Sequence, residues 1–127
     1  MKRASEIYQR SLALMGEVEN EENEVLKERA VMLINVLLSQ LYELDLGLRG
    51  VRFSPGETVP QIRTLQDEVG LSEPILYTVM PLGLAGYLLN EEEPARSKYF
   101  LQLFTAQCDL YRARFKKSFR HKIRRSF

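Results

Sequence analysis

Apolar residues recur every three or four positions along most of the chain, which is the period of one face of an α-helix. The clearest run lies in residues 22–48, where the steps are 4, 3, 4, 4, 3 and 4: Leu26, Ala30, Leu33, Leu37, Leu41, Leu44 and Leu48. Similar spacing predicts helices over residues 4–15 and 72–90, and a fourth helix that begins after Pro94. The pattern therefore predicts an all-α fold, a small bundle of about four helices.

The third predicted helix carries residues that bear on its packing. Ser72 is a good N-cap, and Pro81 lies in the middle of the helix, where a proline is expected to kink it. Gly83, Ala85 and Gly86 then form a small-residue face, on which another helix can pack closely. A phosphate-binding loop is the weaker interpretation, because the run has no Lys-Ser/Thr pair and no preceding strand.

Residues 50–70 form a long connector between the second and third predicted helices. The Pro55-Gly56 pair marks a turn, and a connector of this length is either functional or a small hairpin. Short strands at residues 51–53 and 59–62 would flank that turn, and Pro60 would confine its strand to an edge. We therefore expect a long central loop with a possible short β-hairpin.

The composition leaves little room for catalysis or metal binding. The 127 residues suit one domain, and 45% hydrophobic with 28% charged residues is an ordinary globular balance. One cysteine excludes an internal disulfide and a multi-cysteine zinc site, and one histidine leaves little acid–base chemistry near neutral pH. Cys108 falls on an apolar stripe and is expected to be a small buried hydrophobe. We expect no enzyme, no metal site and no cofactor.

No membrane-spanning or leader segment is expected from the strictly apolar runs. These runs are short, such as residues 31–34, whereas a bilayer-spanning helix needs about 20 predominantly apolar residues. The start of the chain lacks the hydrophobic core of a signal peptide. These features predict a protein that is kept in a reducing cytoplasm, or assembled there into something larger.

Charge divides the chain into an acidic body and a basic end. The formal net charge is +1, but residues 112–127 hold eight bases and no acid, for a net charge of +8. Residues 1–111 hold the other ten bases and all seventeen acids, for a net charge of −7. The expected organisation is a helical bundle domain over residues 1–111 and an extended basic C-terminal docking segment over residues 112–127. Such parts attract each other within one chain or between neighbouring copies.

The basic segment also continues the apolar stripe of the fourth helix. The apolar residues of this stripe follow steps of 4, 4, 3, 4, 4, 4 and 4: Phe100, Phe104, Cys108, Tyr111, Phe115, Phe119, Ile123 and Phe127. Three interpretations fit such a helix: docking on a partner protein, binding of nucleic-acid phosphates, or adsorption to a membrane surface. A frayed, solubilising terminus is a fourth. Partner docking is favoured, because the aromatic residues extend a stripe that the fold already buries. Its expected contacts are Tyr111, Phe115, Phe119, Arg120, Lys122, Ile123, Arg124, Arg125 and Phe127.

Five short motifs in the second half of the chain carry a family resemblance. They are Leu-Gln-Asp-Glu-Val at 65–69, Pro-Ile-Leu at 74–76, Met-Pro-Leu-Gly-Leu-Ala-Gly-Tyr-Leu-Leu at 80–89, Glu-Glu-Pro-Ala-Arg at 92–96 and Tyr-Phe-Leu-Gln-Leu-Phe at 99–104. Together they resemble the head-to-tail connector (adaptor) proteins of tailed bacteriophages, of the type found in phages and prophages of Gram-positive bacteria. In that family an acidic connector leads into a Pro-x-Gly-Leu-Ala helix, and Tyr-Phe opens a long last helix.

The resemblance implies a mainly helical structural subunit without catalysis. Such subunits form a ring, typically of twelve copies, beneath the portal protein, where the ring extends the DNA channel and holds neck or tail-completion proteins. The family often sends its C-terminal segment, or a loop, into a groove of the portal, and the matching segment here is residues 111–127. By the same analogy the connector would contact the channel or the neck ring through Arg52, Phe53, Pro55, Gly56 and Glu57.

Two functions lead at the level of sequence, and an enzyme or regulatory factor of the host is only a remainder, because no catalytic constellation supports it. The first is a virion structural protein at the head–tail interface, assembled in the host cytoplasm. Its partners would be the portal, the neck proteins and copies of itself, with transient contact to channel DNA and no membrane. The alternative is a small DNA-binding protein that uses its basic C-terminal segment. The acidic body argues against the alternative, because nucleic-acid binders usually show a basic face on the fold itself.

Overall fold

The computed structural model describes residues 2–17, 24–51, 56 and 58–125, with residues 115–125 described by their backbone alone. Four α-helices follow one another in this part of the chain: α1 (Ala4–Met15), α2 (Glu24–Leu48), α3 (Met80–Leu89) and α4 (Pro94–Arg125). A π-helical segment, η1 (Ile75–Val79), leads directly into α3. The expectation of an all-α bundle is confirmed.

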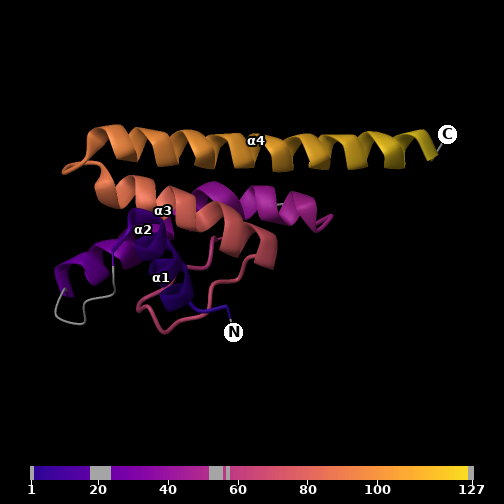
Figure 1. Ribbon diagram of the computed structural model, residues 1–127. Coiled ribbons are helices and arrows are strands. Elements are labelled where there is room, and N and C mark those ends of the chain that lie inside the picture. The colour runs from indigo at the N-terminus through magenta and orange to yellow at the C-terminus, as the bar shows by residue number, and fades with distance from the viewer. Residues whose placement is uncertain (1, 18–23, 52–55, 57, 126–127) are drawn as a thin grey trace.

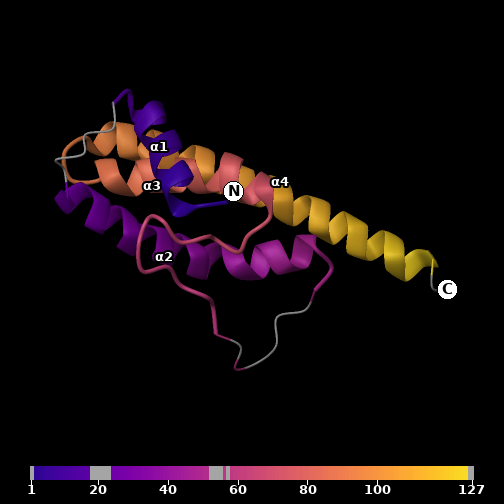
Figure 2. The same cartoon turned by 90° about the horizontal axis from the view of Figure 1, so that it is seen from below.

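Helix α3 is the centre of the bundle. It packs against α1, α2 and α4, and most extensively against α4, which runs back along it after a short turn. Figure 1 shows α4 as a long rod over α3, and Figure 2 shows α2 beside them. The hydrophobic core gathers side chains from all of these elements, among them Ile7, Ile34, Leu76, Leu84 and Phe100.

Two glycines of α3 allow this close packing. A Cβ atom on Gly83 would lie 2.6 Å from Leu37 Cδ2 of α2, and one on Gly86 would lie 2.7 Å from Leu101 Cδ2 of α4. Interiors are densely packed, so a Cβ atom at either position would force these neighbours to shift. The small-residue face expected from the sequence is a packing surface.

Pro81 is accommodated by the π turn that precedes it. A proline has no N–H to donate, and its ring collides with the carbonyl one turn earlier in a regular α-helix. In η1 the hydrogen bonding widens, and the Met80 N–H donates to the Ile75 carbonyl, five residues back. The irregularity expected at Pro81 therefore takes the form of a π turn, and the chain continues as a helix on both sides.

Ser72 stands at the N-cap position predicted for it, directly before the first helical residue, and its carbonyl accepts from the Leu76 N–H at 3.0 Å, but its side chain bonds elsewhere. Its hydroxyl and its backbone N–H both donate to Oδ1 of Asp45, a carboxylate of α2 that is fully buried. An ionised carboxylate is a strong acceptor and takes the hydroxyl away from the local helix end. Asp45 Oδ2 lies 3.0 Å from Arg49 Nε, as an ion pair without hydrogen-bond geometry. Asp45 thereby fixes the end of the connector to α2.

The connector is held by polar side chains rather than by a sheet. Asn35 of α2 donates to the Ile62 carbonyl at 3.0 Å and accepts from the Ile62 N–H at 2.8 Å, so its amide satisfies both backbone groups. Residues 59–62 form no strand, and the hairpin alternative has no support in the described part of the connector. Residues 52–55 and 57, which would form the other strand and the turn, lie outside the described residues.

Helix α1 occupies the residues that the sequence predicts, and its two ends show why. The N–H groups of Ala4 and Ser5 donate to the carbonyls of Asp67 and Leu65, at 2.9 and 2.7 Å, so the connector caps the start of the helix. Gly16 follows the last turn with φ +77°, a left-handed conformation that favours glycine and ends the helix. The connector is therefore tied to both α1 and α2.

Helix α2 is long and apolar enough to cross a membrane by length and composition. An 18-residue window within it has a mean hydropathy of 1.4, and 39% of that window is buried inside the bundle. The strictly apolar runs, which are short, do not reveal this property, because α2 intersperses charged residues among its apolar ones. A buried core helix of a globular protein has the same composition.

Candidate docking surfaces

Helix α4 is a single helix of 32 residues that outruns the rest of the molecule. It starts at Pro94, directly after an acidic turn, and both features favour a helix N-terminus. Its sequence contains neither glycine nor a further proline, so nothing interrupts it before Arg125. Figures 1 and 2 both show its last turns leaving the body of the protein.

The first half of α4 belongs to the bundle. Phe100 and Cys108 are buried, and Phe104 and Tyr111 pack partly buried against the core. The Tyr111 hydroxyl lies 3.5 Å from the Thr78 hydroxyl of η1, and Tyr111 is the last residue of α4 that packs on the core among those whose side chains are described. From Tyr111 to Arg125 the helix continues for about 20 Å, at 1.5 Å per residue.

The second half of α4 carries the bases of the predicted docking segment. Seven of the predicted contacts lie on its helical backbone: Phe115, Phe119, Arg120, Lys122, Ile123, Arg124 and Arg125. Their side chains, and the whole of Phe127, lie outside the described residues. Tyr111 is half-buried at the edge of the bundle. The docking role of these residues stays a prediction.

The predicted contact loop lies mostly outside the described residues. Arg52, Phe53, Pro55 and Glu57 are not described, so nothing tests their role. Gly56 is exposed and has φ +82°, a left-handed conformation that suits the turn predicted there.

A second apolar stripe lies on the solvent side of α4 and was not predicted. We call it the α4 stripe: Tyr99, Leu103 and Leu110, which are 59%, 37% and 52% exposed. Each lies one residue before or after a position on the core side, so apolar pairs such as Tyr99-Phe100 and Leu103-Phe104 were the available signal. The α4 stripe covers about 16 Å of the helix, since its ends are eleven residues apart.

Helix α2 carries a similar exposed stripe. We call it the α2 stripe: Val25, Met32 and Val36, which are 70%, 69% and 46% exposed. It also spans eleven residues. Single exposed apolar residues are ordinary, whereas a row of them along one helix face is a candidate for contact with another protein.

Two adjoining hollows follow the inner edge of α4. The larger measures about 440 Å³ and is lined by Gln40, Leu41, Tyr87, Leu101, Phe104, Thr105, Cys108 and Arg112. The other measures about 420 Å³ and is lined by Asn90, Pro94, Ser97, Lys98, Leu101, Gln102 and Thr105. Both are open to solvent and share Leu101 and Thr105, so they lie next to each other; we call the pair the groove.

Cys108 lines the groove and is the one thiol in it. Burial raises the pKa of the Cys108 thiol, so the sulfur stays protonated and unreactive near neutral pH. Cys108 is thus a buried hydrophobe, as the sequence predicts. Among the residues that the structure describes, no three His, Cys, Asp or Glu side chains come together as a metal site.

Helix α4 joins an acidic end of the molecule to a basic one. Its first turn follows Glu91, Glu92 and Glu93, and its last turns hold bases and no acid. This is the order that the helix dipole favours. Arg96 ties the acidic end to the bundle, because it pairs with Glu93 at 3.1 Å and donates to the Met15 carbonyl at 2.7 Å.

No protein-family model, curated protein or solved structure matches the chain. The projecting end of α4 and the two exposed stripes are the features of the described residues that bear on function.

Proposed function

We propose that this chain is a structural, non-catalytic subunit of a tailed bacteriophage, a head-to-tail connector that joins the portal to the neck or tail. Its partners would be the portal, the neck proteins and copies of itself in a ring, of twelve copies by analogy with the family it resembles. The observation that carries the proposal is α4, which leaves the body after Tyr111 and holds all eight bases of the chain's last sixteen residues in its final turns.

A projecting helix is suited to docking for a physical reason. A segment that is already helical loses less conformational entropy on binding than a disordered one. Phe115, Phe119 and Ile123 repeat at intervals of four, and burying each in a partner's groove is worth about 1.5–3 kcal/mol before the ordering costs. The bases would set register and specificity against acidic groups of the partner, and would raise the rate of encounter.

The proposal is tested on particles. The gene would be expressed with an epitope tag in the phage-producing strain, and purified particles would be probed for the tagged chain by immunogold labelling. We expect labels at the junction between head and tail. A chain that is absent from purified particles, or that labels only the capsid, would overturn the proposal.

A truncation identifies the docking element in the same system. A chain without residues 112–127 should fold and should fail to enter particles, and heads without tails should accumulate. A matched control replaces the bases at Arg63 and Lys98, which lie on the body, with glutamine and should enter particles normally. Normal incorporation of the truncated chain would show that the basic segment is not the docking element.

DNA binding is the second candidate, and one observation favours it. The eight bases from Arg112 to Arg125 share one helix without an acid among them, which is a strong attraction for phosphates. If DNA is the target, affinity for duplex DNA should fall by about a thousandfold or more between 50 and 200 mM salt, for six or more phosphate contacts. Absence of binding at 50 mM salt would remove this candidate.

A further inference from the structure

We propose that two copies of this chain pair through α4, with the projecting end of each copy lying antiparallel in the groove of the other. The pairing goes beyond the proposed function, because it concerns the free chain, before it meets any other protein. It would cover the basic segment until a partner displaces it. The shared face of α4, the extent of the groove and the placement of charge support the pairing.

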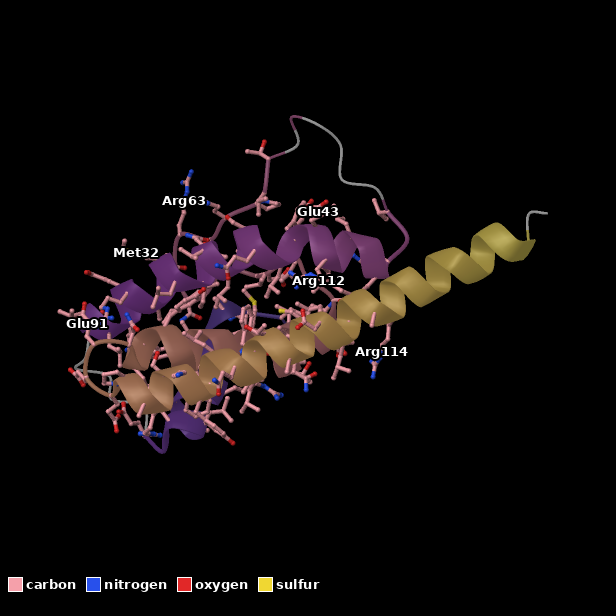
Figure 3. All side chains as sticks on the ribbon, turned by 90° about the horizontal axis from the view of Figure 1, so that it is seen from above. Met32, Glu43, Arg63, Glu91, Arg112 and Arg114 are labelled. Carbon is pink, nitrogen blue, oxygen red and sulfur yellow. The ribbon has the colours of Figure 1, made fainter. Side chains whose placement is uncertain are left out.

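One face of α4 lines the groove in the first half of the helix and continues along the projecting half. An α-helix completes five turns in about 18 residues, so positions that far apart share a face. Six residues of α4 line the smaller hollow: Pro94, Ser97, Lys98, Leu101, Gln102 and Thr105. The positions 18 residues later are three apolar residues and three bases: Arg112, Phe115, Lys116, Phe119, Arg120 and Ile123. Figure 3 shows Arg112 on the side of α4 that faces α2.

The groove has the chemistry and the length to receive the projecting end. Along α4 its two hollows extend from Pro94 to Arg112, which is about 27 Å of helix. Residues 112–125 of the projecting end span about 20 Å. An apolar row at intervals of four residues packs against another helix by fitting into a groove between its side chains. The larger hollow offers such a lining: Leu41, Tyr87, Leu101, Phe104 and Cys108.

An antiparallel arrangement makes this contact twice. When Phe119 of one copy lies level with Leu101 of the other, the reverse also holds, because the donor positions and the groove share one face of a single helix. Each copy then fills the groove of the other around a two-fold axis. These surfaces are used up in the dimer, so the pair adds no third copy through them.

Charge selects the antiparallel direction. In that register Arg124 and Arg125 lie within about one turn of Glu91 and Glu92 of the other copy. These two carboxylates are exposed and form no ion pair with any residue that the structure describes. In a parallel register with the same overlap, Glu91 would instead lie level with Asp109, and like charges would meet.

Cross-linking between two single-cysteine variants tests the register. Thr105→Cys and Lys116→Cys chains, distinguished by tags of different size, should form a mixed disulfide, because these positions lie level to within one residue in the antiparallel pair. Neither should cross-link alone, since like positions would lie about 15 and 18 Å apart along the helix.

Arg114→Cys is the matched control for Lys116→Cys, because Arg114 lies on the side of α4 that faces away from α2 (Figure 3). Mixed with Thr105→Cys, it should give no product. The wild-type chain is the second control, because its one cysteine is buried. The absence of a product between T105C and K116C, or an equal yield with R114C, would overturn the proposal.

Charge reversal tests the contact between the ends, by sedimentation velocity at low salt. Arg125→Glu and Glu92→Arg should each raise the midpoint concentration of dimerisation by about tenfold, because each change occurs twice in the dimer. An equimolar mixture of the two should dimerise as the wild type does. Arg114→Glu changes the net charge as Arg125→Glu does, but outside the groove, and should have little effect. Lys98→Glu should tighten the dimer, since it replaces a base that lines the groove.

The outcomes separate this proposal from the proposed function. A chain that is monomeric at every concentration, that grows beyond a dimer, or that dimerises equally well without residues 112–127 would overturn the pairing. If the dimer forms but the chain is absent from phage particles, only the proposed function fails. If the chain enters particles and the free chain stays monomeric, only the pairing fails.

Discussion

At the scale of single residues, three polar side chains decide where the connector lies. Asn35 accepts a hydrogen bond from the Ile62 N–H, and Asp45 accepts one from the Ser72 N–H. Asp67 closes a turn, because its carboxylate accepts from the N–H groups of Arg63 and Thr64 at 2.7 and 3.1 Å. Asp45 interrupts the apolar positions of α2, which is a signal that sequence analysis could use. Its partner 27 residues away is not visible in a local pattern.

Removing the Asn35 amide should destabilise the protein. Asn35→Ala deletes two hydrogen bonds and leaves both backbone groups of Ile62 without these partners, so we expect the free energy of unfolding to fall by about 1–3 kcal/mol. Urea denaturation measures it. Ser39→Ala on the same helix is the control and should change the free energy by less than about 0.5 kcal/mol. Equal effects would contradict the role of Asn35.

Acid should weaken the turn at Asp67. Hydrogen bonds from the Arg63 and Thr64 N–H groups hold the pKa of Asp67 below its ordinary value of 3.8. A carboxylate with a lowered folded-state pKa stabilises the fold above that ordinary value, and this contribution is lost as the pH falls through the lowered pKa. Asp67→Asn should therefore flatten the decline in unfolding midpoint below about pH 4. Parallel curves for variant and wild type would contradict this.

At the scale of elements, α3 shows how much close helix packing depends on glycine, which has no side chain. Gly83 and Gly86 bring α2 and α4 within reach of its backbone, and the π turn before Pro81 keeps the helix continuous. The sequence predicts both the small-residue face and an irregularity at Pro81. The sequence does not give the form of that irregularity. A kink and a π turn both relieve the collision of the proline ring with the preceding turn and both tolerate its missing N–H.

Gly86→Ala should separate α3 from α4. The added Cβ would lie 2.7 Å from Leu101 Cδ2, so we expect a loss of about 1–3 kcal/mol in the free energy of unfolding. Gly70→Ala is the matched control, because a Cβ there meets nothing within 4 Å and its backbone is not left-handed. Thermal and urea unfolding would compare the two, and an equal change in both would refute the close-packing argument.

At the scale of the whole molecule, the bundle and the projecting end of α4 differ in packing and in charge. The described core ends at Tyr111, and the acidic body and basic segment carry charges of −7 and +8. Opposite charges on one chain favour contacts between copies as well as within one. Met32 of the α2 stripe lies on the side of α2 that faces away from α4 (Figure 3).

Deleting residues 112–127 should leave the bundle intact. Because the described core contacts end at Tyr111, we expect the midpoint of thermal unfolding to change by no more than a few degrees, about 1 kcal/mol or less. Circular dichroism and calorimetry measure it. A longer deletion that also removes Cys108 and Tyr111 should destabilise the bundle clearly. Loss of cooperative unfolding in the shorter variant would show that the segment belongs to the fold.

The sequence by itself determined the helices, their approximate ends and the division of charge. Helix formation depends on spacing, caps and breakers within a few residues, so a local pattern contains the information. Residues 4–15 and the start of α4 at Pro94 are cases in which local signals were sufficient.

Only the tertiary structure decided which apolar faces are covered. Helices α2 and α4 carry apolar residues on more than one side, and the spacing alone does not say which row meets the core. The core rows and the exposed stripes differ in their neighbours, not in their residue types. Burial is a property of those neighbours, and the contacts of Asn35, Asp45 and Gly86 join segments far apart in the chain.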